Sequence, residues 1–161
     1  MRKIFQKFIS ICMIATFIVS SFVTTASAAS LDEGVRREVI GSRVITFEDG
    51  TKGKETLTRI YNPSDINVYG VYERGTYEKT YENNNGELIA KLTATFSYSV
   101  EDKKVSCVSK YGQTYRSDIE EVSLTDTGSG RSCTVKYVFK DWLGFRKTIS
   151  IKCDYKGNVN V

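Results

Sequence analysis

Apolar and polar residues alternate along most of the chain after residue 43, with the period of two that is typical of β-strands. The clearest stretch runs over residues 88–98, where six apolar or aromatic residues share one parity: Leu88, Ala90, Leu92, Ala94, Phe96 and Tyr98. Lysine, threonine and serine occupy most of the positions between them. Because successive side chains of a strand point to opposite faces, this pattern predicts a strand with one buried and one solvated face.

Turn residues divide the rest of the pattern into short strands. The clusters at 49–53, 62–65 and 83–86 favour turns, and the last contains an Asn-Gly pair typical of hairpins. We expect strands over these ranges: 44–48, 56–61, 66–72, 76–82, 88–98, 104–109, 119–124, 133–139 and 148–153. Strands at this spacing predict an all-β domain, either an antiparallel two-sheet sandwich, immunoglobulin-like or similar, or a small barrel.

The first 28 residues have the different pattern of a secretory signal peptide. Three basic residues lie within the first seven, residues 8–23 form an apolar run without a charge, and small residues occupy 26–28. This order predicts cleavage between Ala28 and Ala29 and secretion of the protein. The apolar run is short for a membrane span, so we expect no stable membrane anchor after cleavage.

Residues 29–42 connect the signal peptide to the expected β domain, which covers residues 43–161. Ser30 and Glu33 have the spacing of a helix capping box. Three apolar residues would then share one helical face: Leu31, Val35 and Val39. A short N-terminal helix and a flexible leader are the two alternatives for this segment.

Removal of the signal peptide changes the charge of the protein. The 161-residue chain has a formal net charge of +4, but three of its 23 Lys and Arg residues precede Ala29. The remaining 20 Lys and Arg residues are balanced by 19 Asp and Glu residues, which leaves a net charge of +1. This balance gives no indication of binding to nucleic acid or to an anionic membrane.

Three cysteines remain after cleavage, and in an oxidising compartment two of them could form a disulfide. Cys133 and Cys153 lie on the last two expected strands and would face each other if opposed residue numbers sum to 286. A Cys133–Cys153 bridge is the favoured pairing. Cys107 could instead pair with either of them from a facing sheet, and the third alternative is that no disulfide forms.

Three segments of the C-terminal half carry a resemblance to other proteins: Leu92–Tyr98, Val105–Cys107 and Thr148–Asp154. They are similar to segments of small secreted Gram-positive all-β proteins of unknown function. The resemblance implies an exported domain of two β-sheets. It implies no catalytic residue.

The string Asp126-Thr127-Gly128-Ser129 is similar to the active-site turn of aspartic proteases, in which two aspartates share a proton. Here the string occurs once, only 35 residues follow Asp126, and Thr125 stands where the family has an apolar residue. A solvated loop is therefore the favoured interpretation. The chain has no histidine, which excludes His-based triads and His-ligated zinc sites. We expect no catalytic residue, cofactor or metal site.

Aromatic residues offer the best candidate for a binding surface. Tyr77 and Tyr81 share one parity on an expected strand, and Trp142 lies on an expected loop. Such rings can grip a partner, although tyrosines of alternating strands more commonly pack in a core. The leading hypothesis is a secreted, non-enzymatic β domain that binds a cell-surface or extracellular partner, such as a cell-wall component or protein. The alternative is a secreted antagonist, an antimicrobial protein or enzyme inhibitor, and an aspartic-type hydrolase comes third.

Overall fold

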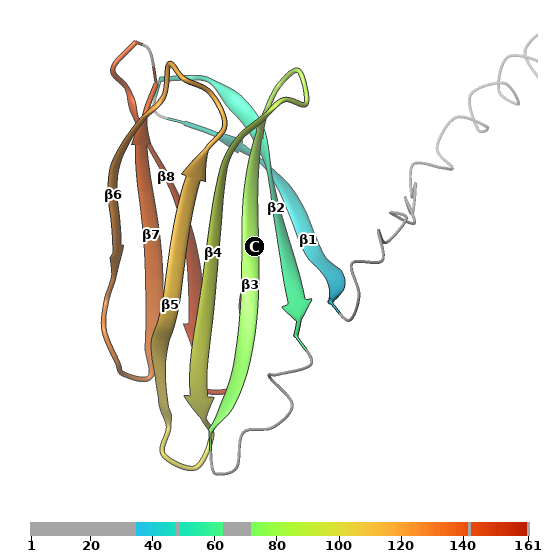
Figure 1. Ribbon diagram of the computed structural model, residues 1–161, viewed down its shortest axis with the longest axis vertical. Coiled ribbons are helices and arrows are strands. Elements are labelled where there is room, and N and C mark those ends of the chain that lie inside the picture. The colour runs from blue at the N-terminus through green and yellow to red at the C-terminus, as the bar shows by residue number, and fades with distance from the viewer. Residues whose placement is uncertain (1–34, 48, 63–71, 142, 161) are drawn as a thin grey trace, which may run out of the picture.

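The computed structural model describes residues 35–47, 49–62, 72–141 and 143–160, and in these ranges the chain is all-β (Figure 1). The first sheet has five strands in chain order: β1 (Arg36–Thr46), β2 (Lys52–Tyr61), β3 (Glu73–Asn83), β4 (Leu88–Ser99) and β5 (Lys104–Thr114). The second has three: β6 (Glu120–Asp126), β7 (Ser132–Lys140) and β8 (Arg146–Asp154). These ranges contain no helix, and so none that could cross a membrane.

The two sheets are antiparallel throughout and pack as a sandwich. Neither sheet closes on itself, because β1 and β5 end the first sheet and β6 and β8 end the second. The predicted two-sheet sandwich is thus confirmed, and the barrel alternative is wrong. The signal peptide and residues 66–71 of the expected strand at 66–72 lie outside the described residues.

Strand β1 begins earlier than the sequence pattern indicated. Residues from Arg36 onward pair with β2 along its whole length, from Arg36 opposite Tyr61 to Thr46 opposite Lys52. The prediction of a leader or short helix over 29–42 is therefore wrong from Arg36 onward. The physical reason is that this stretch is rich in β-branched residues and satisfies its backbone groups on the otherwise open edge of β2.

The core lies between the sheets and follows the predicted alternation. On β4 the residues of one parity from Ala90 to Phe96 are completely buried, and Tyr98 is 5% exposed. The second sheet contributes seven residues with no exposed surface: Cys133, Val135, Tyr137, Phe139, Ile149, Ile151 and Cys153. One buried face per strand explains why the alternation in the sequence located these strands.

The register between β7 and β8 places Cys133 opposite Cys153, so opposed residue numbers sum to 286, the value that the favoured disulfide required. The bridge itself is absent, since Cys107, Cys133 and Cys153 are all free thiols. Burial raises the pKa of Cys153 to about 12 and also raises the pKa of Cys133. Because the thiolate is the species that forms disulfides, this burial disfavours the predicted reaction.

A glycine on β5 allows one close approach between the sheets. The ring of Tyr137 on β7 lies directly over Gly112, and a Cβ placed on Gly112 would be 2.5 Å from two carbon atoms of that ring. No side chain larger than hydrogen fits there unless Tyr137 moves. Tyr137 is completely buried and its hydroxyl donates to Glu121 Oε2 at 3.2 Å, so it has little freedom to move.

We therefore expect Gly112→Ala to lower the free energy of unfolding by about 1–3 kcal/mol through overpacking. Urea denaturation measures the change. Gly130→Ala is the matched control, because its Cβ would meet only one atom, at 3.7 Å. Its effect should stay within about 0.5 kcal/mol. Equal losses of unfolding free energy in the two variants would show that the contact with the Tyr137 ring does not cause the destabilisation.

Candidate functional site

A cavity of about 340 Å³ opens at one end of the sandwich, the upper end in Figure 1. In an antiparallel arrangement every second connection lies at the same end, and here these are the turns β1–β2, β3–β4, β5–β6 and β7–β8. Each of these turns contributes lining residues. The floor is apolar and consists of Tyr81, Ile89 and Phe139, whose side chains belong to the core. The fold thus places polar turn residues around an apolar base.

The β7–β8 turn is organised by Asp141. Its Oδ1 accepts hydrogen bonds from the backbone N–H groups of Leu143 at 3.1 Å and Phe145 at 2.9 Å. Gly144 completes the turn with a positive φ of 86°. An aspartate that caps its own turn in this way directs its second oxygen away from the loop.

The β1–β2 turn is organised similarly by Asp49. Its Oδ1 accepts bonds from the Thr51 N–H at 2.9 Å and from the Thr51 hydroxyl at 2.6 Å. These bonds, of which that from the hydroxyl is the strongest, lower the pKa of Asp49. Asp49 Oδ2 is buried and forms an ion pair with Lys147 Nζ at 3.2 Å.

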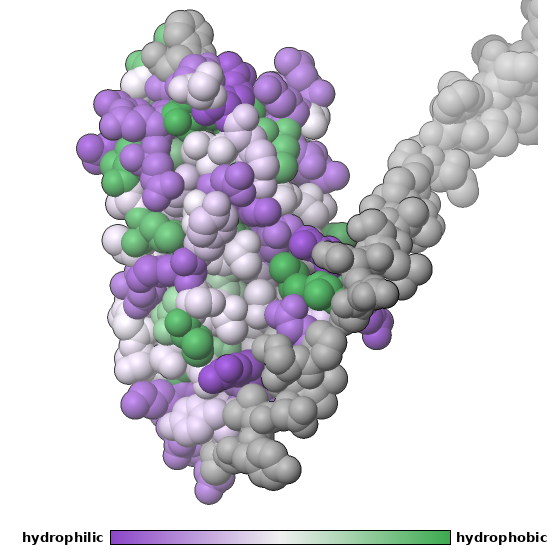
Figure 2. Space-filling view, in the orientation of Figure 1, coloured by the Kyte–Doolittle hydropathy of each residue, from purple (hydrophilic) through white to green (hydrophobic). Residues whose placement is uncertain are grey.

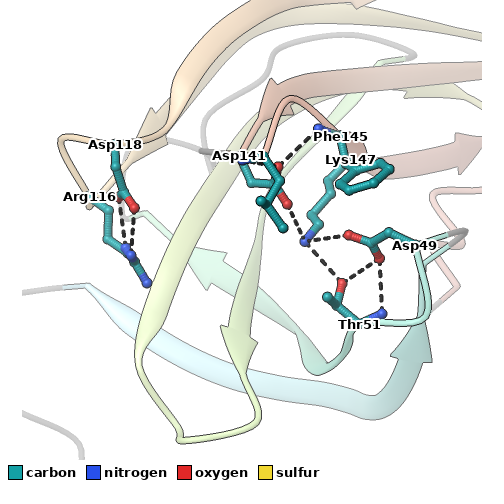
Figure 3. A network of polar contacts seen from close by, with 8 residues as sticks. Asp49, Thr51, Arg116, Asp118, Asp141, Phe145 and Lys147 are labelled. Carbon is teal, nitrogen blue, oxygen red and sulfur yellow. Dashed lines mark hydrogen bonds and ion pairs between the residues drawn. The ribbon is translucent and has the colours of Figure 1, made fainter.

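Lys147 on β8 joins the two turns (Figure 3). Its Nζ lies 3.0 Å from Asp141 Oδ2 and 3.2 Å from Asp49 Oδ2, and it donates to the Thr51 hydroxyl at 3.0 Å. It also lies 5.2 Å from the centre of the Phe47 ring. Lys147 is only 7% exposed. Burial alone would lower its pKa, but the bonds to Asp141 and Asp49 outweigh burial and raise it, so this cluster holds a buried ammonium ion between two carboxylates.

A second ion pair lines the cavity from the β5–β6 connection. Arg116 donates to both oxygens of Asp118, from Nε at 2.8 Å and from Nη2 at 2.6 Å. The hydrogen bonds from Arg116 lower the pKa of Asp118, which therefore stays ionised. Glu87 Oε2 lies 3.5 Å from Arg116 Nη1. The carboxylates that line the cavity are thus paired with cations of the protein itself.

The predicted aromatic surface does not exist in the form expected. Tyr77 is 2% and Tyr81 3% exposed, because both lie on the face of β3 that packs against the second sheet. The Tyr77 hydroxyl donates to the carbonyl of Gly157 at 2.9 Å, and the Tyr81 ring packs edge-on against Phe47. Proposing these two residues as an exposed surface was wrong, although Tyr81 still lines the cavity. Trp142 lies outside the described residues.

The aspartate of the protease-like string has a local role. Asp126 Oδ1 accepts a hydrogen bond from the backbone N–H of Gly128 at 2.8 Å, and Oδ2 forms an ion pair with Lys110. The bond from Lys110 lowers the pKa of Asp126. This geometry is that of a capped loop. In the described part of the chain no three Cys, Asp or Glu side chains converge to hold a metal ion.

The Lys147 cluster was missed by the sequence analysis. Asp49 and Thr51 lie 98 and 96 positions before Lys147, so no local pattern connects them. One signal was present: Lys147 shares the inward parity of Ile149, Ile151 and Cys153. A charged residue at an inward position indicates a buried counter-charge.

Replacing Lys147 with the similarly sized Met should leave Asp49 and Asp141 buried without a counter-ion. We expect Lys147→Met to lose about 3–5 kcal/mol of unfolding free energy, measured in urea. Lys136→Met on the exposed side of β7 is the control and should change stability by less than about 0.5 kcal/mol. A Lys147 variant as stable as the control would contradict a structural role for the cluster.

The ionised form of Asp49 stabilises the fold, because its pKa is lower in the folded than in the unfolded chain. Its contribution is present above the usual aspartate pKa of 3.8 and is lost as the pH falls through the lower, folded value. Thr51→Val removes the hydroxyl donor and should raise the pKa of Asp49, as measured by NMR titration of its side-chain carboxyl carbon. Thr51→Ser keeps the hydroxyl and should keep the low value; an unchanged pKa in Thr51→Val would overturn this assignment.

Comparison with known proteins gives one similar structure. No family model matches the chain, and no curated protein matches it. The crystal structure of the hypothetical protein lmo2686 from Listeria monocytogenes EGD-e is similar to it, with 16% sequence identity and a TM-score of 0.36. The match covers 80% of this chain and 92% of the Listeria chain.

Proposed function

We propose that this chain is an exported, non-enzymatic binding module that recognises a cell-surface or extracellular partner through the cavity at the end of the sandwich. One observation carries the proposal: four turns of a two-sheet scaffold enclose a cavity of about 340 Å³ with an apolar floor and a polar rim. This volume lies within the range of small-molecule and side-chain binding sites. The export part rests on the signal-peptide pattern of residues 1–28.

The chemistry of the rim favours binding over catalysis. A general acid or base needs a side chain that exchanges a proton near neutral pH, and here the candidates at the rim are carboxyl groups. Asp118 has a lowered pKa because Arg116 donates to it, and Asp141 has both oxygens occupied. Cys107 does not line the cavity, and burial raises the pKa of its thiol to about 11, which makes it a poor nucleophile.

The surroundings of the cavity support a partner larger than a free small molecule. Leu143, which lines the cavity, is 56% exposed, and Phe145 in the same β7–β8 turn is 48% exposed. By contrast, the face of the molecule in Figure 2 carries apolar residues mainly as scattered small patches. Exposed apolar residues beside a cavity are typical of a contact site, whereas isolated ones need no explanation.

The same β7–β8 turn supports a second candidate, the secreted antagonist. A turn braced by the Asp141 hydrogen bonds with Leu143 and Phe145 exposed could insert into a cleft of a target. Two results together would favour this candidate. The secreted protein would inhibit an enzyme or kill bacteria, with loss of this effect in Leu143→Arg, and it would not be retained on cell walls.

Binding can be tested with the protein recovered from culture medium, after its intact mass has shown a start at Ala29. We expect it to co-sediment with purified Gram-positive cell walls. Leu143→Arg places a bulky charge at the mouth of the cavity and should weaken retention by about tenfold or more. Val100→Arg is the matched control, since Val100 is 57% exposed in the β4–β5 turn at the opposite end. Absence of retention, or equal retention of both variants, would overturn the proposal.

A further inference from the structure

The β3–β4 turn carries two asparagines that the turn itself does not need. Asn83 builds the turn: its Oδ1 accepts from the N–H groups of Asn85 at 2.9 Å and Glu87 at 3.0 Å, and its Nδ2 donates to Glu87. Gly86 supplies the positive φ of 76°. Asn84 and Asn85 have ordinary negative φ, so their backbone conformation suits most residues. Their side chains line the cavity and bond to no described residue.

Lys52 at the start of β2 is the third polar side chain of the rim that is free. It lines the cavity, and within the described ranges it has neither a hydrogen bond nor an ion pair. The remaining charges of the rim are used internally, Asp141 with Lys147 and Asp118 with Arg116. The groups available to a ligand are therefore two amides and one ammonium group, which together offer several donors and two amide oxygen acceptors.

Hydroxyl groups fit this set best, because each can accept from an amide or ammonium N–H and donate to an amide oxygen. A ligand with several charges fits less well, since Lys52 is the one charged group of the described rim left to pair with it, the others being paired internally at 2.6–3.0 Å. Below the rim, the apolar surface open to a ligand comes from Ile119 and Leu143, with small exposed parts of Tyr81 and Ile89; Phe139 lies beneath them without exposed surface. The matching ligand has an apolar face and a rim of uncharged hydroxyls.

We propose that the cavity binds a neutral sugar residue of a glycan, with the C–H face of the ring on the apolar floor and its hydroxyls hydrogen-bonded to Asn84, Asn85 and Lys52. This inference rests on the proposed function, since it names the ligand class of the same site. The apolar floor contributes burial of the C–H face, and the amides select for the positions of the hydroxyls.

The test is an NMR titration of the ¹⁵N-labelled secreted protein with neutral sugars, glucose, N-acetylglucosamine and their β-linked disaccharides, and separately with glucuronic acid. We expect saturable shifts of the amide signals of Asn84, Asn85 and Leu143 with at least one neutral sugar. The affinity should be nearly unchanged between about 50 mM and about 500 mM NaCl, because no charge pairing is involved.

Variants then assign the contacts. Asn84→Ala combined with Asn85→Ala should weaken binding by about tenfold or more, because two hydrogen-bonding side chains are lost. Asn160→Ala is the matched control, since Asn160 is exposed, bonds to no described residue and does not line the cavity. Lys52→Gln keeps a donor without the charge and should change the affinity for a neutral sugar by less than about threefold.

The outcomes separate this inference from the proposed function. If no neutral sugar gives a saturable shift while cell-wall retention still depends on Leu143, the proposed sugar ligand is wrong and the proposed binding module stands. Binding of glucuronic acid alone, lost at high salt and in Lys52→Gln, would replace the neutral sugar by an anionic ligand. Loss of both retention and shifts would overturn both proposals.

Discussion

The buried contact of Lys147 with Asp49 and Asp141 determines how the cavity end of this protein is organised. It connects the β1–β2 turn of the first sheet to the β7–β8 turn of the second, and each aspartate also caps its own turn. An ammonium ion removed from water is stable only beside such partners, and two buried carboxylates need a cation between them. One cluster therefore sets the positions of both loops and one wall of the cavity.

Packing between the sheets provides the rigid base on which this cluster acts. Gly112 lets the Tyr137 ring lie against β5, and Phe139, Tyr81 and Phe47 continue the aromatic contact toward the cavity. Turns held by their own hydrogen bonds on such a base lose little further freedom when a ligand binds, and this preorganisation favours affinity. The other rim charges are paired internally, and the side chains of Lys52, Asn84 and Asn85 bond to no described residue.

Local alternation predicted more of the fold than of the site. The buried parity of β4 followed from the period of two, which also limited the β7–β8 register to even sums of opposed residue numbers; the structure selected the sum of 286 that opposes Cys133 to Cys153. The same parity placed Tyr77 and Tyr81 on one face, but it could not say whether that face was covered, and the second sheet covers it. The disulfide prediction considered register and compartment only, and not the burial that raises the pKa of both thiols.

By itself, the sequence determined strands, turns and which residues share a face, because these depend on neighbours within a few positions. The first 28 residues also show the order of basic, apolar and small residues that predicts a signal peptide. Only the tertiary structure decided which turns meet, since Thr51 and Lys147 bond across 96 positions of sequence. Partner choice over such distances follows from how the two sheets stack, and this stacking brings an inward lysine and two turn aspartates together at the wall of the cavity.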